Sequence, residues 1–131
     1  METSIALFGA AERGDFVTPH LCKKVEDLFS FFGNPPDASD GIFHAVRILL
    51  YGYWLIYIRV QEEGSGYQDY VQGLRKLCVI QDKIPHLRAL FLPGVGSAEI
   101  VEEGLLVCKK QSSLLIVQET DLYDLLTSQR W

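Results

Sequence analysis

The sequence predicts an α/β domain, a three-layer α/β/α sandwich in which helices cover both faces of a mostly parallel, four-stranded sheet. Short apolar runs alternate along the chain with segments of helical periodicity, and the connections between them are short, as in right-handed βαβ crossovers. The clearest unit is residues 87–117, where two nearly uninterrupted apolar runs flank a proline-glycine turn and a helical pattern. Such runs are typical of strands that are covered on both faces.

The N-terminal part begins with a strand predicted at residues 4–8, and a polar loop at 9–18 follows it. Thr18 and Pro19 then predict a helix start, because a hydroxyl can cap free N–H groups and proline fits the first helical position. Apolar residues recur at helical spacing beyond this point, and Gly33 is expected to end the helix.

The remaining elements follow the same two patterns of apolar spacing. The segment 78–86 is open to two interpretations, an irregular connection or a continuation of the helix before it. We expect further helices at residues 42–51, 66–77, 97–110 and 120–127, and further strands at residues 54–60, 87–92 and 113–117.

The strand order decides where a ligand would bind. If the four strands take the common order 2-1-3-4, the first and third are neighbours and their crossovers leave on opposite faces of the sheet. Flavodoxin-like or Rossmann-like sheets bind ligands at such a switch point, outside the carboxyl ends of the strands. The order is an assumption, and it would bring together two glycine-rich loops, residues 9–18 and 93–97.

Length and composition limit the class of protein. A chain of 131 residues is one domain's worth. The apolar content of 48% and the mean hydropathy of +0.11 are high, so we expect a homo-oligomer that buries part of this surface. The net charge is −5, from 12 basic and 17 acidic residues, and the basic residues are scattered. This pattern argues against nucleic-acid binding.

Neither a membrane span nor a secretory signal is expected. The longest uncharged stretch of the most apolar region is residues 48–58, well short of the roughly 20 residues that a spanning helix needs. The first residues form no basic leader. Three cysteines, odd in number and far apart, favour buried apolar thiols in a reducing compartment over a redox or metal role. We therefore expect a cytoplasmic protein. The sequence contains no metal-binding signature, and it does not indicate a cofactor.

The loop at 93–97 offers candidate binding and catalytic residues. Gly94 and Gly96 could let backbone N–H groups approach an anion at a helix start, but the third glycine of a dinucleotide fingerprint is absent. Glu99, in the first turn after Ser97, would repel a phosphate there. Hydroxyl recognition or a nucleophilic carboxylate suits this loop better. The alternative is that Glu99 only complements the helix dipole.

The loop at 9–18 is the better candidate for an anion. Arg13 lies in it after Gly9, and the helix expected to be capped by Thr18 would point free N–H groups towards the end of the first strand. Glu12 and Asp15 dilute the positive charge. A solvated turn is therefore the alternative interpretation.

The three histidines and the pair Glu62 and Glu63 are further candidates for site residues. His20, in the first turn of the helix predicted after Pro19, could be a neutral general base, or simply an exposed residue of that turn. His44 is interpreted as a satisfied core histidine, and His86 lies in a loop without a partner nearby in sequence. Glu62 and Glu63 are interpreted as a solvated charge pair.

The run LFLPGVGSAEIVEEGLLVCKKQSSLLIV, residues 90–117, resembles the corresponding loop, helix and strand of nucleoside 2-deoxyribosyltransferases. These are small α/β enzymes whose nucleophilic glutamate opens the helix after a glycine-hydroxyl turn. The resemblance implies that Glu99 is the nucleophile and that Gly96 and Ser97 shape the turn.

Two hypotheses about function follow, and whether the protein is an enzyme stays open. In the first, the domain binds or processes a nucleoside-like or sugar-phosphate-like small molecule at the switch point, with Glu99 and His20 as catalytic candidates. Its ligand-binding candidates are Gly9, Arg13, Thr18, Gly94, Gly96 and Ser97. In the second, the chain is a non-enzymatic interaction or subunit module that self-associates through surplus aromatic side chains, namely Phe31, Tyr53, Trp54, Tyr57 and Trp131.

Overall fold

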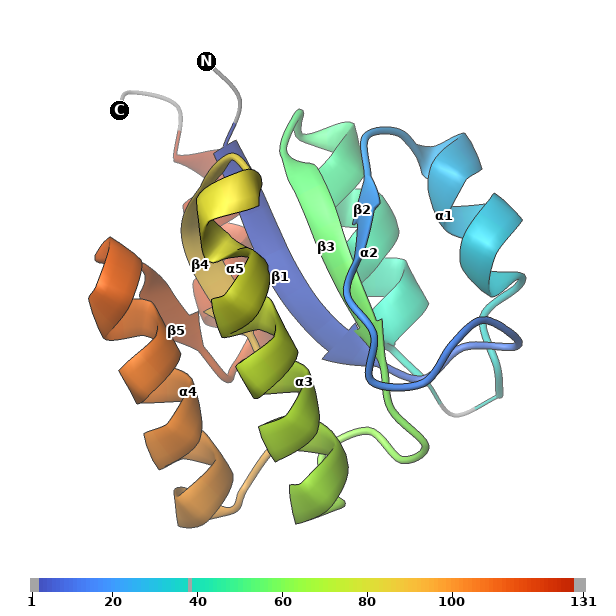
Figure 1. The fold of residues 1–131 in the computed structure, drawn as a ribbon. Coiled ribbons are helices and arrows are strands. Elements are labelled where there is room, and N and C mark those ends of the chain that lie inside the picture. The colour runs from blue at the N-terminus through green and yellow to red at the C-terminus, as the bar shows by residue number, and fades with distance from the viewer. Residues whose placement is uncertain (1–2, 38, 129–131) are drawn as a thin grey trace.

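A computed structural model describes residues 3–37 and 39–128, apart from the side chain of Gln111. It is an α/β fold in which a sheet lies between two layers of helices (Figure 1). The strands are β1 (Thr3–Gly9), β2 (His20–Cys22), β3 (Trp54–Arg59), β4 (His86–Phe91) and β5 (Leu114–Ile116). The helices are α1 (Val25–Phe32), α2 (Gly41–Leu50), α3 (Tyr67–Ile80), α4 (Ala98–Gln111) and α5 (Glu119–Thr127), with a 3₁₀ turn at Gln81–Lys83.

The sheet of the described residues has five strands in the order β2-β3-β1-β4-β5. Strands β3, β1, β4 and β5 pair in parallel, and β2 pairs antiparallel with β3. The four parallel strands are those predicted from the sequence, and their order is the one that was assumed. The predicted number of strands was wrong, because β2 adds a fifth at the edge.

The helix predicted from Thr18 and Pro19 is wrong over its first turns. His20–Cys22 forms β2, and α1 begins only at Val25. Leu21 packs with the apolar cluster on one side of the sheet, whereas Cys22 is buried in the cluster on the other side. Alternation between the two faces is the geometry of a strand. The pairing also covers an edge of β3 that would otherwise be open.

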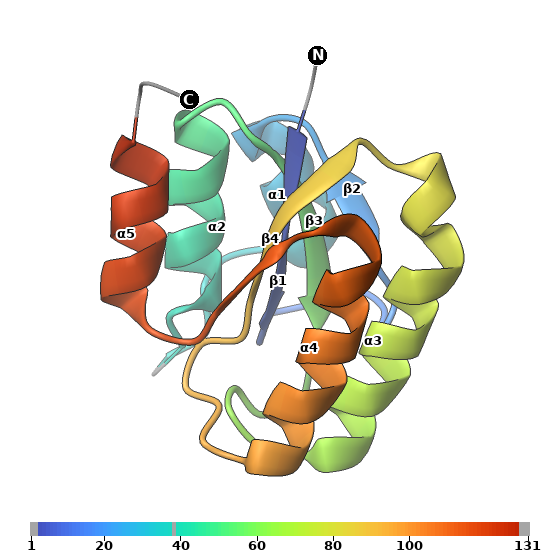
Figure 2. The ribbon, with the colours of Figure 1, turned by 90° about the vertical axis from the view of Figure 1, so that its left-hand side faces the viewer.

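Two apolar clusters fill the space between the sheet and its helices. Along β1, Ile5 and Leu7 point into the cluster beneath α1, α2 and α5, and Ala6 and Phe8 point into the cluster beneath α3 and α4. Figure 2 shows these two helical layers on either side of the sheet, which is seen nearly edge-on. The three-layer arrangement therefore follows from strands that are apolar on both faces.

The helices end close to the predicted positions, with one open question resolved. The segment after Leu77 combines the two interpretations: α3 continues to Ile80, a 3₁₀ turn follows at Gln81–Lys83, and a short irregular connection leads to β4. His86 opens that strand, so the loop expected for it was wrong. Ser97 caps α4, and its hydroxyl accepts a hydrogen bond from the Ile100 N–H at 3.5 Å. None of the helices in residues 3–37 and 39–128 combines the length and apolar character that crossing a bilayer requires.

Candidate functional site

The switch point of the sheet lies between β1 and β4. These strands are parallel neighbours, and the helices that follow them cover opposite faces, α2 with one apolar cluster and α4 with the other. Their carboxyl ends therefore diverge into separate loops, which is where open α/β sheets hold ligands. The loop after β3 reaches the same edge, at the lower end of the β1 and β3 arrows in Figure 1.

The Glu63 carboxylate lies at this edge and is held by donors from two other segments. Its Oε2 accepts hydrogen bonds from the Ala10 N–H at 2.8 Å, the Gly41 N–H at 3.0 Å and the Ser39 hydroxyl, and its Oε1 accepts one from the Asp40 N–H at 3.0 Å. These donors follow the end of β1 or surround the start of α2. We call this set the anion cradle, defined by Ala10, Ser39, Asp40 and Gly41.

Two glycines make room for the anion cradle. A Cβ at Gly9 would lie 2.9 Å from the Gly41 Cα and 3.1 Å from a Glu63 carboxylate oxygen, and one at Gly41 would lie 2.6 Å from the same oxygen. Tyr57, fully buried beneath them, donates its hydroxyl to the Ala10 carbonyl at 2.7 Å. Burial raises the pKa of Tyr57 well above its usual range, so this hydroxyl keeps its proton and remains a donor.

The loop that carries Glu63 also touches the loop after β4. A Cβ at Gly64 would lie 2.5 Å from the Gly94 carbonyl oxygen, so the two backbones are in close contact. The Gly64 N–H donates to the Tyr70 hydroxyl of α3 at 2.7 Å. Residues 61–66, here called the Glu63 loop, therefore bridge the ends of β1 and β4. The earlier interpretation of Glu63 as a solvated charge is wrong, because its carboxylate is fully engaged with protein donors.

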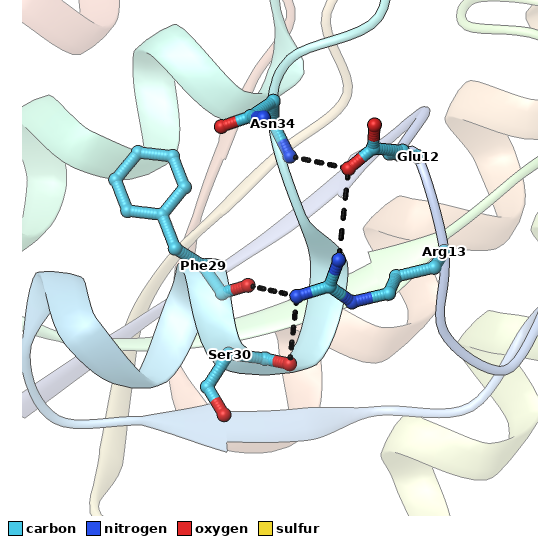
Figure 3. Close-up of polar contacts among 5 residues, drawn as sticks. All are labelled: Glu12, Arg13, Phe29, Ser30 and Asn34. Carbon is cyan, nitrogen blue, oxygen red and sulfur yellow. Dashed lines mark hydrogen bonds and ion pairs between the residues drawn. The ribbon is translucent and has the colours of Figure 1, made fainter.

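Arg13 lies away from the anion cradle, at the end of α1. Its Nη2 donates to the Phe29 carbonyl at 3.0 Å and to the Ser30 carbonyl at 3.4 Å, and its Nη1 lies 3.7 Å from Glu12 (Figure 3). Glu12 in turn accepts a hydrogen bond from the Asn34 N–H at 3.0 Å. The Arg13 guanidinium thus donates hydrogen bonds to carbonyls at the C-terminal end of α1, where a cation is favourable.

Thr18 and His20 do not lie at a helix start, which corrects the geometry expected for both. The Thr18 hydroxyl donates to the Phe16 carbonyl at 3.0 Å and caps no helix. His20 opens β2, and its ring packs against Phe31 and Phe32 at centroid distances of 5.1 and 5.4 Å. The dipole argument for a neutral His20 therefore has no structural basis.

Glu99 and Ser97 are at the predicted start of α4. Glu99 is exposed in the first turn, and no hydrogen bond or ion pair joins it to Arg13 within the part of the chain that the structure describes. Gly94 and Gly96 lie in the loop before this helix, and Gly94 is the one that contacts the Glu63 loop. Of the predicted site residues, only Gly9 and Gly94 thus meet around Glu63.

His44 differs from the satisfied core histidine that was expected. It is 5% exposed, its ring packs edge-on against Phe91 at the end of β4, and its Nδ1 has no hydrogen-bond partner among the residues that the structure describes. Burial is the largest effect on the pKa of His44 and lowers it, against weaker raising effects of Glu119, Asp40 and Glu63. A buried polar atom without a hydrogen-bond partner destabilises the folded state.

A cleft of about 430 Å³ is lined by Gln61, Glu62 and residues 65–69, so the Glu63 loop forms much of its wall. Within residues 3–37 and 39–128, no cluster of three or more His, Cys, Asp or Glu side chains is suited to hold a metal ion.

A scan against protein-family models and a search of curated proteins found no match to this chain.

Proposed function

We propose that the chain binds or processes a small nucleoside-like or sugar-phosphate-like molecule at the carboxyl ends of β1 and β4. The observation that supports this proposal is the convergence of four donors on one carboxylate at the switch point. Backbone N–H groups at a helix start, together with a hydroxyl, suit the anionic group of such a ligand.

The α4 start would supply the recognition of hydroxyl groups. Glu99 is exposed there and free to act as a nucleophile or hydroxyl acceptor, in the role that the resemblance to nucleoside 2-deoxyribosyltransferases implies, with Gly96 and Ser97 shaping the turn. Arg13 could contact the anion only by leaving the α1 carbonyls that it now serves. Glu99 is therefore the stronger candidate of the two.

We further propose that the topology is flavodoxin-like within the wider Rossmann-like class, and that the protein acts in the cytoplasm. The order of the four parallel strands supports the first statement. The second is supported by three free thiols, of Cys22, Cys78 and Cys108. Burial raises the pKa of Cys22 to about 12 and that of Cys108 to about 11, as for inert core thiols.

Thermal unfolding in the presence of nucleosides and phosphorylated metabolites tests the ligand proposal. A ligand at a hundredfold its Kd should add about 2.7 kcal/mol to the free energy of unfolding. Glu99→Gln should abolish turnover or weaken binding of that ligand, whereas Glu102→Gln, an exposed glutamate on the same helix, should change neither. A panel in which no compound raises the melting temperature would contradict the proposal.

A second candidate function is a self-associating interaction module. Its support is the exposure of large apolar side chains on α2 and α5, with Phe43 62% and Leu50 72% exposed. The residues first expected at the interface do not all fit. Tyr57 is fully buried, so that expectation was wrong, and Trp131 lies outside the described residues. Sedimentation at micromolar concentration tests whether a dimer forms.

A further inference from the structure

We propose that Glu63 is an internal competitor for the ligand: its carboxylate occupies the place of the ligand's oxyanion, and the Glu63 loop covers the ends of β1 and β4 until an anion displaces it. This inference rests on the proposed function, since it places the ligand's anionic group at the same edge of the sheet. It adds a regulatory step, in which binding and loop release are one event.

The first argument is the chemistry of the anion cradle. In the described part of the chain, no lysine, arginine or histidine forms an ion pair with Glu63. The carboxylate is stabilised by three backbone N–H groups and one hydroxyl. These donors contact only the two carboxylate oxygens of the glutamate, and acetate or phosphate carries the same kind of acceptor atoms.

The second argument is the way the Glu63 loop is attached. Gly64 and Gly66 have φ values of +88° and +91°, and Ser65 between them is exposed. Towards the edge of the sheet, the loop contacts the anion cradle through Glu63 and the Gly94 backbone through Gly64. Release of the carboxylate therefore removes one of the two contacts of the loop at this edge, while the Gly64 N–H bond to the Tyr70 hydroxyl still ties the loop to α3.

The third argument is the unpaired nitrogen of His44. This residue lies on α2, one turn after Asp40 and Gly41, and its ring contacts Phe91, the last residue of β4. Its Nδ1 is buried and has no hydrogen-bond partner among the described residues. The start of the same helix supplies the Asp40 and Gly41 N–H groups of the anion cradle. A ligand whose anion fills the cradle and whose second polar group reaches His44 would use both features.

A titration followed by ¹⁵N NMR tests the proposal at the atoms concerned. The amides of Ala10, Asp40 and Gly41 report on the anion cradle, and sodium acetate and inorganic phosphate are the probes at constant ionic strength. In Glu63→Ala, the chemical shifts of these amides should change as acetate or phosphate is added, and the Kd obtained from them should be at least tenfold lower than in the wild type. Glu62→Ala is the matched control, because Glu62 is exposed and its carboxylate accepts a hydrogen bond from the neighbouring Ser65 hydroxyl rather than from the anion cradle. It should behave like the wild type.

A Kd in Glu63→Ala equal to that of the wild type would overturn the proposal and leave Glu63 a structural side chain. If Glu63→Ala does not fold, Glu63→Gln replaces it, since the amide keeps the size of the side chain and removes the charge. In the wild type, hydrogen exchange at Gly64 and Ser65 should also accelerate as phosphate is added. Exchange that does not change would equally contradict loop release.

The two proposals fail in different ways. If acetate or phosphate fills the anion cradle of Glu63→Ala but no nucleoside or sugar phosphate stabilises either protein, the competitor role stands and the proposed function falls. If a sugar phosphate stabilises the wild type and Glu63→Ala to the same extent, the proposed function stands and the competitor role falls.

Discussion

At the scale of single residues, the site at the carboxyl ends of the strands depends on glycines, which have no side chain, as much as on polar side chains. Gly9 and Gly41 let the end of β1 approach the start of α2, so that donors from both reach one carboxylate. Tyr57 closes the space below them. A side chain at either glycine would occupy the volume that the Glu63 carboxylate now takes.

Gly41→Ala should lower the free energy of unfolding by about 1–3 kcal/mol, the usual cost of overpacking. The new Cβ would lie 2.5 Å from the Tyr57 hydroxyl and 2.6 Å from a Glu63 oxygen. Alanine is the better helix former, so a loss must come from this collision. Urea unfolding measures it, with Gly96→Ala as control, where a Cβ has no neighbour within 4 Å. Equal losses in both variants would contradict the argument.

His44 should make the protein less stable as the pH falls. Because burial lowers its pKa in the folded state, the unfolded chain takes up a proton near pH 6.5 that the folded chain does not. The free energy of unfolding then decreases below that pH, by up to about 1.4 kcal/mol per pH unit, until the folded-state pKa is reached. His44→Leu should remove this part of the loss between pH 7 and 5.5. Urea unfolding at several pH values measures this loss. If the free energy of unfolding falls by the same amount with pH in both proteins, His44 is not its cause.

At the scale of elements, α1 is a short helix whose end is completed from elsewhere in the chain. It has no basic residue in its last turn, and a helix leaves its last carbonyls without intrahelical partners. Arg13, from the loop after β1, donates to the Phe29 and Ser30 carbonyls of that last turn (Figure 3), and the Phe29 carbonyl also accepts the Gly33 N–H. The long loop between β1 and α1 is thereby tied to the helix, and β2 is held at the edge of the sheet between them.

Arg13→Ala should therefore destabilise the end of α1, by about 0.5–1 kcal/mol given that its side chain is 59% exposed. Amide hydrogen exchange at Phe32 and Gly33 should accelerate, since the carbonyls of the last turn lose a partner. Arg75→Ala, which removes an exposed arginine of α3, should leave that exchange unchanged. If Arg13→Ala leaves it unchanged too, the guanidinium does not stabilise the helix.

The helices could be predicted from apolar residues at helical spacing, and the parallel strands from short, nearly uninterrupted apolar runs. The strand β2 could not, because its three residues alternate between the two faces of the sheet but form no such run, and Thr18 with Pro19 formed a strong helix-start signal. What makes these residues a strand is the open edge of β3, a tertiary cause. The sequence thus predicted the layers of the fold, and missed an element that depends on its neighbour.

At the scale of the whole molecule, the site could be predicted as a place but not as a set of residues. Strand order located the edge between β1 and β4, and Gly9 and Gly94 do lie there. Glu63 was missed because a pair of glutamates after a strand is usually solvated, and its donors lie at least 22 residues away in the chain. A signal was nevertheless present, since Glu63 also follows a strand that ends at the same edge.

The outer surface of α2 leads to a prediction about assembly. Phe43 and Leu50 are seven residues apart and so lie on the same face of the helix, two turns from each other. With 62% and 72% of these residues exposed, and Tyr123 of α5 51% exposed, this face is the surface that we expect to be buried in a dimer. The wild type should then sediment as a dimer at tens of micromolar.

The double variant Phe43→Ser, Leu50→Ser should sediment as a monomer with an unchanged melting profile in dilute solution, because neither side chain belongs to the buried core. Val79→Ser, Leu106→Ser is the matched control, since these side chains are 75% and 58% exposed on α3 and α4, across the sheet from α2. It should remain a dimer. A wild type that is monomeric at every concentration would rule out self-association. Loss of the dimer only in the control would place the interface on the other face of the sheet.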